Sequence, residues 1–502
     1  MALLNSVMSW IMKQRMHQIE LFIKYPHEVQ DDCFRWLTSS AKNTEWGLKY
    51  RYGSITKLSQ FKDRVPINNY DGLKPYIDRL RKGEQNILWP QEIKWFAVSS
   101  GTASDKSKFI PVSEDTIEEC HFKGGKDVLT IYCNNTPDTK LFDGKGLALG
   151  GSHTVSEIDN EAFYGDLSAI LIQNMPFWAQ FIRTPDLSIA LMNEWESKLE
   201  KIARITSAED VTSLSGVPSW TLLLLKKILD ITGKKNIIDV WPNLELFIHG
   251  GISFLPYNEQ YKSIISSDNM NYLETYNASE GFFGIQDRHN ADDMLLMLDY
   301  GIFYEFLPIS DLDKENPQTL SLHEVETDTN YALIISTNSG LWRYKIGDTI
   351  KFTSLNPYRI KISGRTKNFI NAFGEELMID NADQALEIAC KKTSAIISEY
   401  TAAPVFYKDK NVGAHEWLME FETEPENIEY FNEVFDNALK SLNSDYEAKR
   451  YHDMILNKPV IHVLPKHTFY KWLKIRGKLG GQHKVPRLTN DRKYVEEILK
   501  LI

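Results

Sequence analysis

The chain has few cysteines and no long hydrophobic run. Its 502 residues include only Cys33, Cys120, Cys133 and Cys390, and no two of them form a C-x-x-C pair. This spacing argues against a disulfide framework and against a zinc site, so we expect a reducing, cytoplasmic environment. No stretch approaches the roughly 18 to 20 apolar residues of a membrane span. The nearest candidate, Thr221–Leu225, is followed directly by two lysines.

Positive charge is also scarce. The formal net charge is -11, which argues against broad binding to nucleic acid, although a local basic pocket for a nucleotide is still compatible with it. The segment Met1–Met12 is fairly apolar but lacks a basic start and a small-residue cleavage site, so we expect a helix there and not a signal peptide. We therefore expect neither a nucleic acid nor a membrane as partner.

The composition, with 42% hydrophobic and 25% charged residues, is that of a folded globular protein. The length predicts one large domain and one smaller domain. Short apolar runs alternate with amphipathic stretches from residue 93 to about 352, which indicates an α/β architecture. The pattern changes after Tyr358, where we expect strand, turn and strand over 360–373 and then a helix. We place the domains at 1–358 and 359–502.

One polar loop is the first candidate site. The run from Phe96 to Pro111 is apolar at both ends and contains hydroxyl residues, one glycine and three basic or acidic residues between them. Gly101 allows a tight turn, and neighbouring N–H groups, hydroxyls and Lys108 suit a phosphate. The second glycine of a Walker A loop is absent. An ordinary polar surface loop is the alternative.

A second cluster spans Glu274 to Gly284. An aromatic residue, Tyr276, precedes the pair Ser279-Glu280, and glycines flank two phenylalanines. At the end of a strand, such a carboxylate can hold magnesium while the hydroxyl contacts phosphate. A glycine-rich turn over an apolar patch is the alternative.

Two further clusters are weaker. The run from Gly340 to Asp348 predicts a strand that ends in Gly-Asp, where a carboxylate could accept both hydroxyls of a ribose. The run from Lys478 to Arg487 has glycines before Lys484 and a proline after it, so a domain movement could deliver this lysine into a site. A hairpin turn and a charged surface loop are the respective alternatives.

The order of these clusters resembles the carboxylate-adenylating superfamily that includes firefly luciferase and acyl-CoA ligases. Within it, the chain is similar to the plant auxin-responsive acyl acid amido synthetase family, specifically to its bacterial relatives. The residues that carry this resemblance span nearly the whole chain: Val65-Pro66, Tyr70-Asp71, Ser99-Ser100-Gly101-Thr102 with Lys108 and Pro111, Tyr276 with Ser279-Glu280-Gly281, Arg343-Tyr344 with Gly347-Asp348, and Gln482 with Lys484 and Pro486-Arg487.

The resemblance implies a large adenylating domain of mixed β-sheets with flanking helices, and a small, mobile α+β lid. It implies ATP and Mg²⁺ as cofactors and a two-step ligation of a carboxylic acid to an amine such as an amino acid. It also implies that the protein is a monomer. The implied catalytic residues are Lys484 and the magnesium ligand Glu280. The implied ATP-binding residues are Ser99, Ser100, Gly101, Thr102, Lys108, Gly250, Gly251, Tyr276, Ser279, Asp348 and, at the hinge, Arg365.

The acid pocket is less well defined by the sequence. Mostly aromatic residues lie between the first two clusters, and Phe177, Trp178, Val217 and Trp220 are the candidates for an apolar acid. With 24 phenylalanines, 23 tyrosines and 12 tryptophans in the chain, core packing is the alternative for each aromatic residue. Ala103 and Asp105 depart from the family pattern in the phosphate loop, and Asp105 would repel triphosphate if it faced inward.

Two other functions stay open at this point. An acyl-CoA ligase would form the same adenylate and transfer the acyl group to a thiol. A nucleotide-binding protein without catalysis is the second, suggested only by Ala103 and Asp105.

Overall fold

The structure is a computed structural model. It describes residues 14–99, 108–150, 156–158, 162–175, 182–192, 194–312, 314–366, 369–370, 372–373, 375, 377–407, 413–450, 456–479 and 484–502. The N-terminal helix expected within Met1–Met12 lies outside these residues. In the part of the chain that is described, no helix is long and apolar enough to cross a membrane.

The chain divides into two compact units. The first comprises Met1–Gly251, Ser266–Ile346 and Ile350–Lys361, and the second comprises Ile252–Ile265, Gly347–Thr349 and Ile362–Ile502. The second unit therefore includes two short segments from the middle of the sequence as well as the C-terminal residues.

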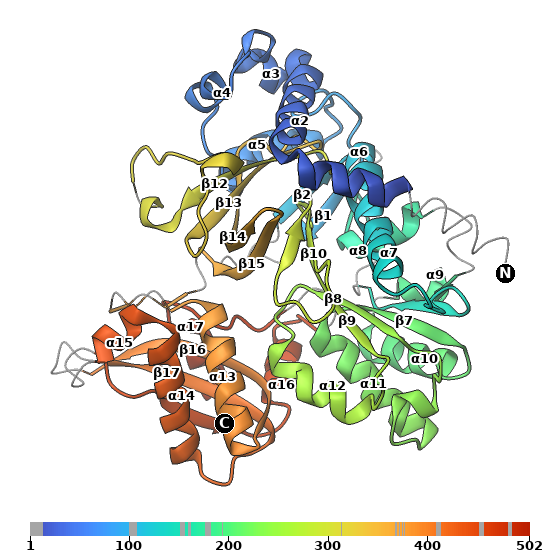
Figure 1. The fold of residues 1–502 in the computed structure, drawn as a ribbon, viewed down its shortest axis with the longest axis vertical. Coiled ribbons are helices and arrows are strands. Elements are labelled where there is room, and N and C mark those ends of the chain that lie inside the picture. Colours follow the sequence, from blue (N-terminus) through green and yellow to red (C-terminus); the bar gives the residue numbers. More distant parts are fainter. Residues whose placement is uncertain are drawn as a thin grey trace. The chain divides into compact units, whose positions relative to one another are not determined.

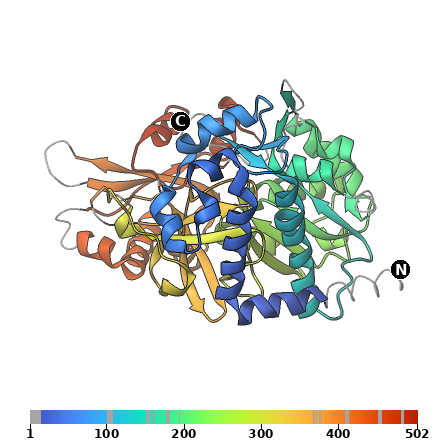
Figure 2. The ribbon, with the colours of Figure 1, turned by 90° about the horizontal axis from the view of Figure 1, so that it is seen from above.

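The first unit begins with helices. Residues 14–24 are helical, and the helices that follow are α2 (Pro26–Ser40), α3 (Glu45–Lys49), α4 (Leu58–Arg64) and α5 (Tyr70–Leu80). Pro26 suits the first turn of α2, where its missing N–H costs no hydrogen bond. The Gln30 amide donates to the carbonyls of Leu298 and Ile302 at 2.9 and 3.0 Å, which ties α2 to strand β12 (Ile302–Pro308). Figure 2 shows these blue helices across the yellow strands.

A large mixed sheet forms the centre of the first unit. Among the described residues its order is β12-β13-β14-β15-β11-β10-β9-β8-β7-β3-β6. Strands β9, β8, β7, β3 and β6 are parallel, whereas β9 to β10, β10 to β11, β11 to β15 and β12 to β13 are antiparallel pairs. The bounds not yet given are β3 (Lys145–Ala148), β6 (Arg183–Thr184), β7 (Val211–Gly216), β8 (Leu246–Gly250), β9 (Asn271–Ala278), β10 (Gly281–Ile285), β11 (Met294–Leu296), β13 (Asn330–Thr337), β14 (Tyr344–Leu355) and β15 (Tyr358–Arg365).

A smaller sheet and further helices complete this unit. The small sheet has the described order β2-β1-β5-β4, from β1 (Trp95–Ser99), β2 (Lys108–Val112), β4 (Ser156–Ile158) and β5 (Ala162–Gly165). The helices are α6 (Glu114–Thr116), the π-helix η3 (Ile117–Phe122), α7 (Lys123–Asn135), α8 (Leu167–Asn174), α9 (Leu187–Ala190), α10 (Trp195–Thr206) and α11 (Pro218–Thr232). Helices α10 and α11 pack together beside β7 (Figure 1). The apolar run in α11 is buried, so Leu222, Leu224 and Leu225 form core and not a membrane surface.

The second unit has its own sheet and core. Strand β17 (Gly413–Thr423) pairs antiparallel with β16 (Ile396–Phe406) and parallel with β18 (Val460–Leu464). Helices α13 (Ile379–Thr393) and α14 (Ile428–Leu442) pack side by side, and a buried apolar cluster that includes Trp417, Phe431 and Phe435 fills this unit (Figure 1). The other helices are η6 (Leu255–Tyr257), α12 (Asn258–Ile264), α15 (Ser444–Arg450), α16 (Thr468–Ile475) and α17 (Lys493–Leu499).

The predicted α/β architecture is confirmed, and one local expectation is wrong. Gly347-Asp348 does not end a strand, because β14 runs through both residues to Leu355, with Gly347 at φ +101°. The second strand expected within 360–373 falls partly outside the described residues. In the described part, Ile370 forms a single antiparallel backbone bridge with Leu377, and the Phe373 N–H donates to the Glu375 carboxylate at 2.7 Å.

Candidate functional site

The carboxyl ends of the parallel strands meet along one edge of the large sheet. Ala148 of β3 pairs with Ser215, Gly216 of β7 pairs with His249, and Gly250 of β8 pairs with Thr275 of β9. In open α/β sheets, ligands bind outside the carboxyl ends of the strands. The predicted Gly250 ends β8 at this edge, and the predicted Val217, Gly251 and Ser279-Glu280 directly follow the strands β7, β8 and β9.

The pair Ser279-Glu280 forms the turn of a tight hairpin. Ala278 pairs with Gly281 across the hairpin, and only the two predicted residues lie between them. Ser279 is 5% exposed and Glu280 is 6% exposed. A Cβ at Gly281 would lie 2.6 Å from the Ile302 side chain, so a glycine is needed there. The sheet thus holds one nearly buried carboxylate at the edge where ligands bind.

Residues of η3 and of the first turn of α7 support this hairpin. The Phe282 N–H donates to Cys120 Sγ at 3.2 Å, and a Cβ at Gly124 would lie 2.5 Å from the Phe282 ring. His121 in η3 is buried, and burial lowers its pKa to about 4. His121 is therefore neutral at physiological pH and adds no positive charge to this edge.

The predicted phosphate loop connects two paired strands. Ser99 at the end of β1 lies opposite Lys108 at the start of β2. Ser100, Gly101 and Thr102 lie outside the described residues. The Phe109 N–H donates to the Tyr70 hydroxyl at 2.9 Å, and Lys108 Nζ is 5.9 Å from the Tyr70 ring centroid. Tyr70 therefore supports the base of the loop, a contact that helical spacing alone does not reveal.

Gly250 and Gly251 have different requirements. A Cβ at Gly250 would lie 2.4 Å from the Thr275 carbonyl oxygen, so β8 approaches β9 too closely for a side chain. Gly251 adopts φ +83°, which favours glycine. His249, one residue earlier, is buried, and this burial lowers its pKa to about 3. Tyr276 is also buried, with its ring centroid 4.8 Å from that of Phe283.

The structure describes two of the four residues predicted for the acid pocket. Val217 precedes α11 and Trp220 lies in its first turn, with its ring 4.9 Å from the Trp195 ring of α10. Phe177 and Trp178 lie outside the described residues. Lys198 on α10 is fully buried and donates to the Gly150 carbonyl at 3.2 Å. Burial lowers the pKa of Lys198 to about 8. No spacing pattern in the sequence indicates that this lysine is buried.

Three predicted residues come together in the second unit. Arg365 Nε lies 2.7 Å from Asp348 Oδ1, and Asp348 is 8% exposed. Lys484 is half-buried. Its pKa is lowered to about 8, mainly by burial and then by Arg365, while Asp348 opposes the shift. Gln482 of the same motif lies outside the described residues.

A metal would need ligands from a substrate here. The described residues contain no group of three or more His, Cys, Asp or Glu that could hold a metal ion. Magnesium, however, is commonly bound by one or two carboxylates together with substrate phosphates and water. The single carboxylate of Glu280 fits that mode and does not fit a metal held by protein alone.

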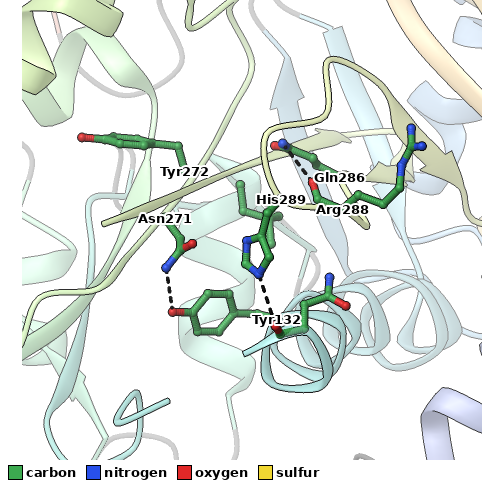
Figure 3. Close-up of a pocket in the computed structure, with 8 residues that line it drawn as sticks. Tyr132, Asn271, Tyr272, Gln286, Arg288 and His289 are labelled. Carbon is green, nitrogen blue, oxygen red and sulfur yellow. Dashed lines mark hydrogen bonds between the residues drawn. The ribbon is translucent and has the colours of Figure 1, made fainter. Parts of the chain in front are cut away.

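A separate small pocket lies near the start of β9 (Figure 3). Asn271 Nδ2 donates to the Tyr132 hydroxyl at 3.3 Å, and Gln286 Nε2 donates to the Arg288 carbonyl at 3.3 Å. Because Asn271 begins β9 and Ser279 follows its end, roughly 25 Å of strand separates the two. The residues that line this pocket, Tyr132, Asn135, Asn271, Tyr272, Leu273, Gln286, Arg288 and His289, include no predicted site residue.

Comparisons with known proteins cover almost the whole chain. The GH3 family N-terminal domain matches residues 15–270, the GH3 family central domain matches 295–365, and the GH3 family C-terminal domain matches 380–493. Indole-3-acetic acid-amido synthetase GH3.3 of Arabidopsis thaliana is 23% identical, over 92% of this chain and 89% of that protein. The 4-substituted benzoates-glutamate ligase GH3.12 of Arabidopsis thaliana is 22% identical, over 93% and 94%.

Solved structures share the fold. The GH3.15 acyl acid amido synthetase superposes with a TM-score of 0.77 at 16% identity, covering 97% of this chain and 95% of that one. The 2-hydroxyisobutyryl-CoA ligase in its postadenylation state superposes with a TM-score of 0.59 at 11% identity, covering 94% and 90%. At these identities, the structural likeness establishes the fold alone.

Proposed function

The chain belongs to the GH3 family, and from this premise we propose that it is an ATP-dependent acyl acid amido synthetase. The observation that carries the proposal is the cluster of Asp348, Arg365 and Lys484 in the second unit. Asp348 and Arg365 form an ion pair between the neighbouring strands β14 and β15, and the charges of both act on the pKa of Lys484, which is distant from them in the sequence.

The proposed reaction has two steps. An oxygen of the carboxylic acid attacks the α-phosphorus of ATP, and pyrophosphate leaves with the electrons of the broken P–O bond. The nitrogen of an amine then attacks the acyl carbon, AMP leaves, and the nitrogen loses a proton to give the amide. Neither step needs a covalent bond to the protein, so positioning and charge stabilisation supply the catalysis.

The first unit would supply the phosphate, metal and acid groups. Ser99, Ser100, Gly101, Thr102 and Lys108 would contact phosphates, and Gly250, Gly251 and Tyr276 would line the nucleotide site. Glu280 would hold Mg²⁺ and Ser279 would lie beside it. When bound, the magnesium would neutralise part of the phosphate charge. The buried hairpin turn supports this assignment, because it fixes the carboxylate before substrate arrives.

The second unit would supply the remaining charges. Asp348 would accept hydrogen bonds from the ribose hydroxyls, and Lys484 would stabilise negative charge at the α-phosphate during the first step. With a pKa of about 8, Lys484 is mostly protonated at neutral pH. We propose Arg365 as the hinge of a mobile lid that withdraws Lys484 before the second step.

The substrate classes follow from the relatives. Their names describe conjugation of indole-3-acetic acid and of benzoates, in the latter case with glutamate. We propose an apolar or aromatic carboxylic acid and an amino acid for this chain. The edge-to-face rings of Trp195 and Trp220 near the carboxyl end of β7 support an apolar acid pocket. A monomeric state and a cytoplasmic location stay predictions.

A second candidate is an acyl-CoA ligase, favoured by the likeness to the fold of 2-hydroxyisobutyryl-CoA ligase. Such an enzyme would share the first step and differ in the acceptor.

One experiment tests the function in two stages. Exchange of labelled pyrophosphate into ATP, measured over a panel of apolar and aromatic acids, reports the first step without the amine. Acids that support exchange are then incubated with ATP and either mixed amino acids or CoA, and the products are identified by mass spectrometry. We expect amides. Thioesters alone would replace the proposal by the CoA ligase, and no exchange with any acid would contradict both.

A further inference from the structure

A buried ion network surrounds Arg487 in the second unit. Arg487 is 6% exposed, and its guanidinium lies 2.9 Å from Asp383 Oδ1 and 3.2 Å from Glu399 Oε1. It also donates to the Tyr257 hydroxyl at 3.3 Å, and that hydroxyl donates to Glu399 Oε2 at 3.0 Å. The Tyr400 hydroxyl donates to Asp383 Oδ1 at 2.6 Å, and Arg487 lies 4.5 Å from the Tyr400 ring centroid.

The network depends on the arginine. Burial raises the pKa of Glu399, and the positive charge of Arg487 counteracts that shift. Removing one partner of a buried ion pair leaves the other charge uncompensated, which is strongly unfavourable. Without Arg487, Asp383 and Glu399 would both need to take up protons, find water or move.

Backbone hydrogen bonds hold the chain segment between Lys484 and Arg487 against strand β16. The Arg487 carbonyl accepts from the Ala402 N–H at 2.7 Å, and the Ala402 carbonyl accepts from the Thr489 N–H at 3.1 Å, so the segment runs beside β16. The Thr401 hydroxyl donates to the Pro486 carbonyl at 2.6 Å. Lys484 is three residues from Arg487, a reach of at most about 11 Å.

The same network holds the segment that follows Gly250-Gly251. Tyr257 lies in η6, and Gln260 of α12 donates through Nε2 to the Ile397 carbonyl of β16 at 3.1 Å. Residues Ile252–Ile265 thus belong to the second unit through side-chain bonds, although the sequence places them between strands β8 and β9.

We propose that Arg487 is a positioning residue for Lys484, acting through its buried network with Asp383, Glu399 and Tyr257. The role of Lys484 in catalysis rests on the proposed function, but its positioning by Arg487 does not. The network fixes the segment 484–489 and the segment 252–265 as one body. Lys484 is thereby held in the half-buried environment near Arg365 and Asp348 that lowers its pKa.

The test measures the position of Lys484 directly. Intact protein without substrate is labelled with acetic anhydride over a range of pH, and the acetylated fraction of Lys484 is read by peptide mass spectrometry to give its apparent pKa. We expect about 8 in the unmodified protein. In Arg487→Gln we expect a rise of about one unit or more, toward the ordinary lysine value of about 10.4.

A matched control separates positioning from general damage. Arg450 is also buried in the second unit, where Nε lies 2.8 Å from Asp436 Oδ1 beside the Tyr446 hydroxyl. Arg450→Gln breaks a comparable ion pair and should leave the apparent pKa of Lys484 unchanged. A folded Arg487→Gln variant with an unchanged Lys484 pKa, or an equal shift in both variants, would overturn the proposal.

Milder variants cover the case in which Arg487→Gln does not fold. Tyr257→Phe removes one hydroxyl and Glu399→Gln removes one charge, and each should raise the apparent pKa of Lys484 by less than Arg487→Gln does. No shift in either variant would also overturn the proposal. The labelling uses no substrate, so it reports the effect of Arg487 on the apparent pKa of Lys484 even if the protein is inactive on every acid. Such inactivity would contradict the proposed function but not the positioning role of Arg487.

Discussion

The two units contribute candidate site residues of opposite character. The first unit presents glycines, hydroxyls and one nearly buried carboxylate, Glu280, at the edge of a sheet. The second unit brings together charged side chains. Asp348 forms an ion pair with Arg365, and the charges of both residues act on the pKa of Lys484. The first set suits a fixed cradle for phosphates, whereas the second suits a charge that is delivered and withdrawn.

The interactions that hold the two sets of residues in place also differ. Backbone pairing between β8, β9 and β10 and close glycine contacts hold the first set. Side-chain ion pairs around Arg487 and Arg365 hold the second. Backbone pairing tolerates changes of charge, while a buried ion network does not, so substitutions should affect the two sets differently.

The largest effect is expected from Glu280→Gln. The amide keeps the size of the side chain but removes the charge that would hold magnesium, so pyrophosphate exchange should fall by about a thousandfold, as for other lost transition-state electrostatics. Asp292→Asn, at a carboxylate 85% exposed in the same unit, is the control and should exchange normally. Circular dichroism should show both variants folded.

A near-normal rate of pyrophosphate exchange by Glu280→Gln at saturating magnesium would contradict the assignment of Glu280 as the magnesium ligand. The hairpin carboxylate would then be a structural element of the sheet edge.

The next largest effect is expected from Lys484→Ala, and it should be confined to one step. Adenylation, measured by pyrophosphate exchange, should slow by about a hundredfold, because the lysine would act on charge that develops in that transition state. Single-turnover amide formation from a supplied acyl-adenylate should change little, since the lysine would be withdrawn by then.

Equal losses in both steps would contradict the contrast between a fixed first unit and a second unit that delivers and withdraws Lys484. They would mean that Lys484 is structural or that the second unit does not alternate between positions.

The alternation of apolar runs and amphipathic stretches was enough to predict the α/β fold. Within the region 93–352, the apolar runs Leu244–Ile248 and Tyr331–Ile335 overlap strands β8 and β13, and the amphipathic stretch Ser219–Thr232 overlaps helix α11. Short, nearly continuous apolar runs are typical of strands buried on both faces, and β13 is buried from Tyr331 to Thr337. The Ser279-Glu280 pair was also expected at a strand end, and lies there.

Other features depend on contacts that sequence spacing does not encode. Gly-Asp is common in turns, yet Gly347 with φ +101° lets β14 bend and continue past Asp348. Lys198 is buried although lysine is normally exposed, because the Gly150 carbonyl receives its hydrogen bond. The partners of Arg487 come from three distant elements, so its network is visible only after folding.

A smaller effect is expected from Asp348→Ala. Loss of two hydrogen bonds to a charged acceptor, each worth about 1.5 to 3 kcal/mol, should raise the KM for ATP by tenfold or more. The turnover number at saturating ATP should change less than KM does. Arg365→Gln is the matched variant, because it removes the 2.7 Å partner and leaves the carboxylate in place.

A lower thermal midpoint with an unchanged KM would show that Asp348 only supports Arg365 and β14. The ribose assignment would then be withdrawn.

The effect that is smallest at neutral pH is a dependence on pH, and it separates the two units most sharply. Burial holds the pKa of His121 at about 4 and that of His249 at about 3, so both are neutral from pH 6 upward. Lys484, by contrast, has a pKa of about 8. If the protonated lysine is required, kcat/KM for adenylation should be flat below this value and fall about tenfold per pH unit above it, because kcat/KM reports the free enzyme.

Lys484→Arg should remove this basic limb, since a guanidinium stays protonated throughout the range, even if the rate at neutral pH is lower. Glu280→Gln should lower the whole profile and keep the limb, because it leaves the titrating lysine in place. Pyrophosphate exchange over pH 6 to about 10 measures all three proteins, within the range where lysine and arginine differ in charge. A basic limb that persists in Lys484→Arg would assign the titration to another group, and the division between the fixed cradle of the first unit and a titrating lysine in the second would no longer hold.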